Sequence, residues 1–313
     1  MNRSFEVIAG PCSVNETNIK QLYEIAKMSV NGRWAVGGLR VVGLKSRTAY
    51  KEGNPAYMGM DALVYERNLA ARLYNDTQIV DMEQLPSLVI GVDLAKHYGI
   101  RIATEIMDSD IQLGLAALES GLNGLFVPWN PSANQLGFPV LRTARMAARY
   151  GWTVGIKNGK WIGAETNLAD DSSVENRTPI EDVWNGLAVY ADLLNNHKIM
   201  IHRGFDVPEK GDHRNLPLHN MAAAVKARAG ECVRMFYDPS HALGPKMRDQ
   251  IVANTVLAAQ MRMPDGSYIY DGLLIEAGDS TTDTDQHVTL AELEDLIIQL
   301  SKYRDIVTPT RYN

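Results

Sequence analysis

The sequence predicts a single α/β domain of the (β/α)8 TIM barrel class, and three observations support this prediction. Short apolar runs alternate with longer segments whose apolar residues recur at helical spacing, which is typical of βα units in a parallel sheet. Eight such pairs can be counted along the chain. The length of 313 residues fits one barrel of about 250 residues with insertions, and no linker or repeat divides it. We therefore expect residues 1–313 to form one barrel domain.

The predicted strands are short runs of mostly Val, Ile, Leu and aromatic residues, a composition that favours strands. In order, they cover residues 5–9, 39–44, 101–105, 124–127, 153–156, 199–203, 234–237 and 273–276. A doubly wound open sheet is the rival α/β fold, but it would require a Gly-rich phosphate turn after an early strand. No such turn follows the first run, so the barrel is favoured.

The predicted helices are longer and repeat apolar residues every three or four positions. In order, they cover residues 18–30, 62–74, 109–120, 140–150, 180–194, 218–229, 248–261 and 290–302. Extra length lies between the second and third strands, where residues 45–100 hold two helical stretches, and in the polar stretch 158–177. Long connections after barrel strands are where barrel enzymes place their chemistry.

Composition excludes several classes of protein and partner. Apolar residues make up 45% of the chain and charged residues 22%, so a disordered, collagen-like or coiled-coil protein is excluded. The net charge of −6 provides no broad positive field for nucleic acid or for an anionic membrane. Two cysteines, Cys12 and Cys232, make no disulfide framework. Neither a secretory signal nor a membrane-spanning run is found, and we expect a cytoplasmic protein.

Potential metal ligands follow the first, seventh and eighth predicted strands. They are Cys12, His241, Glu276 and, just beyond the last strand, Asp279, Asp283 and Asp285. Because the carboxyl ends of barrel strands face one mouth, we expect these side chains to converge. Sulfur, nitrogen and oxygen donors together suit a divalent Mn, Fe, Co or Zn ion.

Cations gather at the ends of other predicted strands. They are Arg40, Lys45 and Arg47 from the second strand, Lys157 after the fifth and Arg203 at the end of the sixth. An acidic chain that concentrates cations at its barrel mouth is suited to phosphorylated or carboxylated small molecules. Taken singly, a cysteine is more often a small buried hydrophobe, and a lysine or arginine is more often a solvated surface charge. Their joint placement at strand ends is what favours a functional site.

Six of these segments, in order, resemble motifs of the class I 3-deoxy-heptulosonate-7-phosphate (DAHP) synthases and the related 3-deoxy-octulosonate-8-phosphate synthases. The resemblance runs from Ala9 to about Thr289. The segments read Ala9-Gly10-Pro11-Cys12-Ser13, Arg40-x4-Lys45-Ser46-Arg47-Thr48, Ala103-Thr104-Glu105-Ile106-Met107-Asp108, Gly155-Ile156-Lys157-Asn158-Gly159, Arg203-Gly204 and Asp238-Pro239-Ser240-His241. Ser46 stands where the family usually has proline.

The resemblance implies a role for each matching residue. Cys12, His241 and Glu276 would bind the metal, and Asp283 would be the fourth ligand, with Asp285 and Asp279 as alternatives. Arg40, Lys45, Lys157 and Arg203 match residues that bind phosphoenolpyruvate, while Arg47 and Thr48 match the motif that holds the sugar phosphate. Lys45, Cys12 and His241 would be the catalytic groups, with Glu105 a further candidate for proton transfer. Relatives assemble as dimers or tetramers, so a homo-oligomer is expected.

The reaction that the resemblance implies is a metal-dependent condensation in which C3 of phosphoenolpyruvate attacks an aldehyde, water adds at C2, and phosphate leaves. Erythrose 4-phosphate is the first acceptor to consider, because the segment after the second strand looks more like that of the heptulosonate enzymes. Such an enzyme would belong to aromatic amino acid biosynthesis through the shikimate pathway.

One departure bears on the donor. After the fourth strand the family carries an arginine that grips the phosphate, whereas this chain has Val127-Pro128-Trp129-Asn130. Trp129 cannot supply that charge, so either Arg142 or Lys160 takes over the phosphate or the donor is a different, unphosphorylated keto acid. A catalytically silent binding relative is a third alternative, which the retained ligands and cations argue against.

Overall fold

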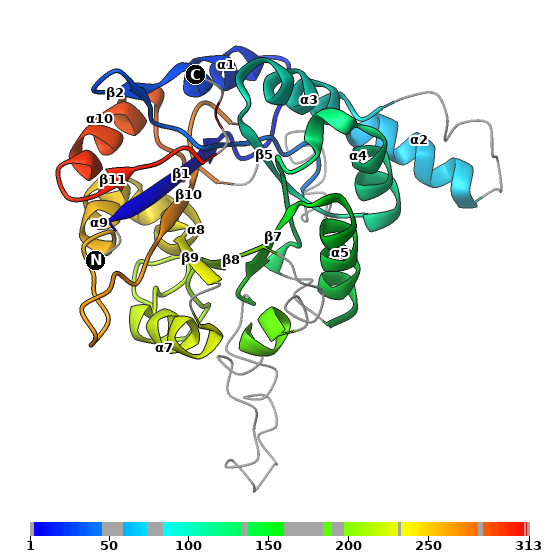
Figure 1. The fold of residues 1–313 in the computed structure, drawn as a ribbon. Helices are drawn as coiled ribbons and strands as arrows, with labels where there is room; N and C mark the ends of the chain where they lie inside the picture. The colour runs from blue at the N-terminus through cyan, green and yellow to red at the C-terminus, as the bar shows by residue number, and fades with distance from the viewer. Residues whose placement is uncertain are drawn as a thin grey trace, which may run out of the picture.

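The structure is a computed structural model that describes residues 3–45, 59–73, 84–132, 137–159, 184–189, 197–230, 233–280, 284–309 and 311. It confirms the predicted fold class. Parallel strands pair in the order β10-β9-β8-β7-β6-β5-β4-β1, and β1 also pairs with β10, which closes the barrel. Helices form a ring around this barrel (Figure 1).

Each predicted strand overlaps a strand of the barrel. The barrel strands are β1 Ser4–Gly10, β4 Gly38–Arg40, β5 Arg101–Glu105, β6 Phe126–Trp129, β7 Thr153–Lys157, β8 His197–His202, β9 Val233–Tyr237 and β10 Gly272–Glu276. β6 starts two residues later than predicted, because Gly124 adopts a φ of 71°, which belongs to a turn and not to a strand. β11, Asp305–Ile306, pairs with the start of β1 and was not predicted.

Most helices also lie where the sequence places them, with differences at their ends, whereas the short helix α8 has no counterpart among the predicted helices. They are α1 Ile19–Lys27, α2 Ala62–Leu73, α3 Pro86–Tyr98, α4 Gly114–Leu118, α5 Gly137–Tyr150, α7 His219–Ala229, α8 Pro239–Leu243, α9 Ile251–Ala258 and α10 Leu290–Ser301. Of the helix predicted at 180–194, the described residues 184–189 are helical.

Two predicted helices are interrupted for identifiable reasons. The first ends at Lys27, not at residue 30, because β2 (Ser29–Val30) and β3 (Arg33–Trp34) form a hairpin whose Asn31-Gly32 turn has positive φ at both residues. The helix predicted at 109–120 begins instead as a π-helical turn, Ser109–Leu113, capped by the Asp108 carboxylate.

Strand alternation divides the core into an outer and an inner layer. Val7 and Ala9 of β1 belong to the large apolar cluster that packs under the helices, whereas Ile8 between them belongs to a smaller cluster inside the barrel. The inner cluster comprises Ile8, Val42, Ala103, Val127, Trp129, Ile199, Ile201, Phe236 and Leu274. On most of these strands, the residue two positions after a member of the inner cluster therefore faces the barrel mouth.

The opposite end of the barrel is closed by charge pairs. Glu6 of β1 is fully buried and pairs with Arg101 of β5 and with Arg234 of β9, whose Nη1 lies 2.5 Å from the carboxylate. These pairs join three strands at their amino ends, a position associated with stability and not with catalysis. No helix in the described part of the chain combines the length and the apolar character needed to cross a bilayer.

Gly10 provides a test of the packing at the mouth. A Cβ at this position would lie 2.3 Å from the carbonyl oxygen of Arg40 on the neighbouring strand, so we expect Gly10→Ala to lower the free energy of unfolding by about 1–3 kcal/mol. Gly114 is the matched control, since a Cβ there meets nothing within 4 Å and the residue is helical. Gly114→Ala should leave stability unchanged or raise it by up to about 1 kcal/mol. Equal urea midpoints for the two variants would contradict this packing.

Candidate functional site

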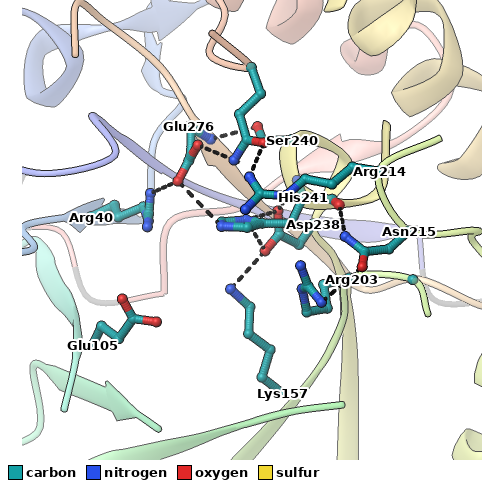
Figure 2. A network of polar contacts seen from close by, with 12 residues as sticks. Arg40, Glu105, Lys157, Arg203, Arg214, Asn215, Asp238, Ser240, His241 and Glu276 are labelled. Atoms are coloured by element: carbon teal, nitrogen blue, oxygen red, sulfur yellow. Dashed lines mark hydrogen bonds and ion pairs between the residues drawn. The ribbon is translucent and has the colours of Figure 1, made fainter. Parts of the chain in front are cut away.

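A ring of buried polar side chains occupies the carboxyl ends of the barrel strands. In β9, Met235 and Tyr237 belong to the outer apolar cluster and Phe236 to the inner one, so the alternation directs Asp238 into the mouth. The same alternation holds on the other strands. It places Arg40, Glu105, Trp129, Lys157, Arg203, Asp238 and Glu276 in one ring, each of them at most 5% exposed. All of these except Trp129 are labelled in Figure 2.

The Glu276 carboxylate ends β10 and lies at the centre of the hydrogen bonds in this ring. Its Oε1 accepts from Arg40 Nη1 at 2.7 Å and lies 4.0 Å from Lys45 Nζ, while its Oε2 accepts from Gln286 Nε2 at 2.8 Å. The backbone N–H of Glu276 donates to Ser240 Oγ at 3.0 Å. Burial opposes ionisation, but the charges of Arg40 and Lys45 keep the pKa of Glu276 well below its usual range. The carboxylate is therefore ionised.

His241 is held in one orientation by Asp238. Asp238 caps the short helix α8 by accepting the backbone N–H of His241 at 3.1 Å, and its carboxylate also meets Nδ1 of the imidazole at 3.0 Å. Burial lowers the pKa of His241 to about 4, so the ring is neutral near pH 7. Since Asp238 accepts at Nδ1, the lone pair is at Nε2, which faces Glu276 Oε1 at 3.6 Å.

Lys157 shares Asp238 with His241. Lys157 Nζ lies 2.9 Å from the second oxygen of this carboxylate. Burial, together with the nearby charges of Arg40 and Arg203, lowers the pKa of Lys157 despite the Asp238 charge. Burial also works against the Asp238 charge, but contacts with His241 and Lys157 hold the pKa of Asp238 well below its usual range. An anion brought to Lys157 would relieve the repulsion between these cations.

Arg203 follows β8 and is fixed by two asparagines. Its backbone N–H donates to Asn158 Oδ1 at 2.7 Å, and Asn158 Nδ2 donates to the carbonyl of Gly204 at 2.9 Å. The guanidinium donates from Nη1 to Asn215 Oδ1 at 3.2 Å. The end of β8 is thereby tied to the end of β7 and to the connection that follows Gly204.

Lys45 and Glu105 form a looser pair on the other side of the ring. Lys45 Nζ lies 3.6 Å from Glu105 Oε2, which is longer than a hydrogen bond. Burial opposes the lysine charge, but Cys12 and Glu105 outweigh burial and raise the pKa of Lys45 above its usual value. Lys45 is therefore a cation near pH 7 and not a base.

Trp129 occupies the ring without adding charge. It is fully buried, and Arg40 and Lys157 each lie 5.8 Å from the centroid of its ring, within the range of cation–π attraction. Gly155 on the next strand makes room for it, since a Cβ there would lie 2.9 Å from the Cβ of Trp129.

Arg142, suggested above as a replacement for the missing arginine, lies on α5 with its side chain 59% exposed and pairs with Asp110, so it is not in this ring. Lys160 lies outside the described residues.

The donors of the predicted metal centre are partly brought together. His241 Nε2 and Glu276 Oε1 both carry lone pairs and lie 3.6 Å apart. This separation agrees with a tetrahedral ion, because two ligand atoms that each lie about 2.0–2.2 Å from such an ion are roughly 3.3–3.6 Å from each other. This pair fits one divalent ion. Cys12 is fully buried and close enough to Lys45 and Arg40 to raise the pKa of both. Among the residues that the structure describes, no group of three His, Cys, Asp or Glu side chains that could hold a metal is found, so the complete centre stays a prediction.

The remaining predicted residues divide into two groups. Arg47, Thr48 and Asp283 lie outside the described residues. The alternative ligands Asp279 and Asp285 are exposed at the surface, where Asp279 accepts from Gln21 at 2.7 Å and Asp285 lies 3.6 Å from His287. Neither alternative faces the ring of charges.

Sequence reasoning missed several members of this site. Asp238 was treated as part of a motif, without a role of its own, although the alternation along β9 points it inward. Arg214, Asn215 and Gln286 were not singled out, because they lie in connections whose path the sequence pattern does not predict. These three residues share only a long polar side chain about ten residues after a strand end. Many residues in the chain meet this description, so it does not select them.

No protein-family model matches this chain, and no curated protein matches it either. The closed (β/α)8 barrel is a fold typical of enzymes, and its catalytic groups are characteristically found at the carboxyl ends of the strands. The ring described above occupies that end.

The His241 tautomer gives a pH prediction. We expect ¹⁵N spectra of histidine-labelled protein to show a protonated Nδ1 and a bare Nε2 at pH 7, with no protonation until the pH approaches about 4. An unfolded histidine has a pKa near 6.5, so between about pH 6.5 and 4 the unfolded chain takes up a proton that the folded chain does not. His241 should therefore make the free energy of unfolding fall as the pH falls through this window. A protonated Nε2 at pH 7, or a midpoint near 6.5, would contradict the geometry.

Proposed function

We propose that this chain is a barrel synthase that condenses phosphoenolpyruvate with an aldose phosphate, giving a 3-deoxy-2-keto sugar acid phosphate and inorganic phosphate. Erythrose 4-phosphate is the first acceptor to test. The observation that supports this proposal most directly is the set of four buried cations at the mouth, Arg40, Lys45, Lys157 and Arg203, each at most 7% exposed.

The charge of the ring favours an anionic ligand. Among the described residues of the ring, four buried cations face three carboxylates, those of Glu105, Asp238 and Glu276, so positive charges outnumber negative ones there. Uncompensated buried charge is costly, and an incoming carboxylate or phosphate would offset it. The lowered pKa of Lys157 shows that its ammonium group in particular is destabilised by its surroundings. Phosphoenolpyruvate carries both a carboxylate and a phosphate, which suits cations placed on two sides of the mouth.

The residues present can perform the proposed steps. C3 of the enol donor forms a bond to the aldehyde carbon, water adds at C2, and the C2–O bond breaks as phosphate leaves. Lys45 Nζ donates its proton to the aldehyde oxygen as this becomes an alkoxide, and Glu105 Oε2, 3.6 Å away, accepts a proton from the water and returns it to Lys45. Lys157 and Arg203 hold the phosphate and Arg40 the carboxylate, so that positioning lowers the barrier.

We propose that a divalent Mn, Fe, Co or Zn ion binds beside these groups, which the 3.6 Å separation of His241 Nε2 and Glu276 Oε1 supports. Cys12, His241, Glu276 and Asp283 would hold it, and such an ion acts as a Lewis acid towards a carbonyl oxygen. Asp238 contributes by keeping the Nε2 lone pair of His241 turned towards Glu276.

A second candidate is a condensation with an unphosphorylated keto acid such as pyruvate. Trp129 supports it, because a neutral aromatic ring occupies a position in the ring of charges where a third phosphate-binding cation would otherwise stand. The two candidates differ in one product, since only the phosphoenolpyruvate reaction releases phosphate.

Phosphate release tests the proposal. We expect metal-loaded protein to release phosphate from phosphoenolpyruvate when erythrose 4-phosphate or another aldose phosphate is present. His241→Ala should reduce the rate by about a hundredfold or more, because it removes both the lone pair at Nε2 and the partner of Asp238. His97→Ala is the matched control, since His97 is an exposed residue of α3, and this variant should retain full activity.

The outcome separates the two candidates. Turnover of pyruvate with an aldehyde, with no phosphate released from phosphoenolpyruvate under any acceptor, would overturn the first candidate in favour of the second. No product from either donor in protein that binds metal would contradict both.

A further inference from the structure

The connection between β8 and α7 returns to the barrel mouth after an excursion. Gly204, with a φ of 76°, starts it, and a Cβ there would lie 2.4 Å from the carbonyl oxygen of Asn215. Phe205 and Leu216 then pair as a short antiparallel bridge, with N···O distances of 3.0 and 2.7 Å. This hairpin brings Arg214 and Asn215 back against the ring of charges, next to Arg203 and His241 (Figure 2).

Asn215 joins two members of the ring. It is fully buried, its Oδ1 accepts from Arg203 Nη1 at 3.2 Å, and its Nδ2 donates to the carbonyl of His241 at 2.5 Å. Its backbone N–H also donates to the carbonyl of Ala242 at 2.9 Å. A primary amide suits this place because it accepts on one side and donates on the other, which a carboxylate or an apolar side chain cannot do.

Arg214 reaches a third member through a second amide. Its backbone N–H donates to the carbonyl of Leu243 at 2.8 Å, and its guanidinium donates to Gln286 Oε1 and, at 3.2 Å, to Thr284 Oγ1. Gln286, which is fully buried, then donates from Nε2 to Glu276 Oε2 at 2.8 Å. The donors on one side of the amide fix its orientation, so its N–H must face the carboxylate. Glu276 Oε1 is thereby left to Arg40 and to the side facing His241.

We propose that Arg214 and Asn215 act as a clasp, two adjacent positioning residues that set different parts of the site. Asn215 sets the guanidinium of Arg203 for the anionic group of the donor, and Arg214, through Gln286, sets the carboxylate of Glu276 beside His241. This inference rests on the proposed function. It adds that donor binding and the chemical step are supported by separate branches of one hairpin.

The test measures inorganic phosphate binding by calorimetry and steady-state turnover of phosphoenolpyruvate in the same variants. Asn215→Asp places a carboxylate against Arg203 and against the carbonyl of His241, and it should weaken phosphate binding and raise KM by about tenfold to a hundredfold. Arg214→Gln leaves the Arg203 contact intact, so it should lower kcat by about tenfold while the phosphate Kd stays within about twofold. Asn215→Ser, which can accept or donate with one hydroxyl, should give an intermediate Kd and serves if the aspartate variant does not fold.

Lys246→Ala is the matched control. Lys246 is exposed and lies 3.4 Å from Asp212 at the tip of the same hairpin, so its loss disturbs the hairpin without touching the ring. Both phosphate Kd and kcat should be unchanged in this variant.

Each result decides between the hypotheses. Wild-type protein that binds no phosphate overturns the proposed function and the clasp together. Wild-type binding that persists unchanged in Asn215→Asp overturns the clasp alone. If the Asn215 and Arg214 variants show the same rise in phosphate Kd and the same fall in kcat, and both changes follow a fall in Tm, the hairpin is merely structural. That result would also overturn the clasp.

Discussion

The buried ion pair between Arg40 and Glu276 is the interaction on which the organisation of the barrel mouth depends. It joins β4 to β10 across β1, at the seam where the first and last strands of the barrel meet. The contact is possible because the intervening residue, Gly10, has no side chain. Both charges are almost fully buried, and removing either partner of such a pair typically costs about 3–5 kcal/mol because the other is left uncompensated. The contact that joins these strands across the seam therefore also requires that Glu276 is ionised.

The remaining charges follow from this first pair. With Glu276 ionised, the lone pair of His241 Nε2 lies 3.6 Å from its Oε1, an oxygen that also accepts from Arg40. Burial disfavours protonation of His241, and Asp238 fixes its tautomer, so in the proposed function this pair would be available to a divalent ion. The pKa of Lys157, which shares Asp238, is lowered by burial and by the charges of Arg40 and Arg203. In the proposed function, the metal site at His241 and the anion site at Lys157 would both depend on Asp238, the carboxylate that these two residues share.

The sequence predicts the fold and much of the site for the same physical reason. Strands such as β5 and β10 are short apolar runs with a polar residue at the end, so both their existence and the charge they carry to the mouth can be predicted. The alternation that also places Asp238 there was available but unused. The clasp could not be predicted, because it depends on the Phe205–Leu216 bridge and on where a connection of irregular backbone returns. The π-helical turn at Ser109–Leu113 could not be predicted either, because its apolar residues keep the spacing of an α-helix although its backbone hydrogen bonds are those of a π-helix.

Trp129 shows how a neutral residue can belong to a ring of charges. A cation in its place would add a further positive charge next to Arg40 and Lys157, in a mouth where cations already outnumber carboxylates. The aromatic ring instead attracts both cations weakly and excludes water between them, which strengthens every remaining electrostatic contact in the ring. Gly155, directly beside it on β7, gives the indole its space, so Trp129 and Gly155 act together as a pair. In the proposed function, recognition of the anionic group would therefore fall on Lys157 and Arg203, and through them on Asp238 and Asn215, which hold these two cations in place.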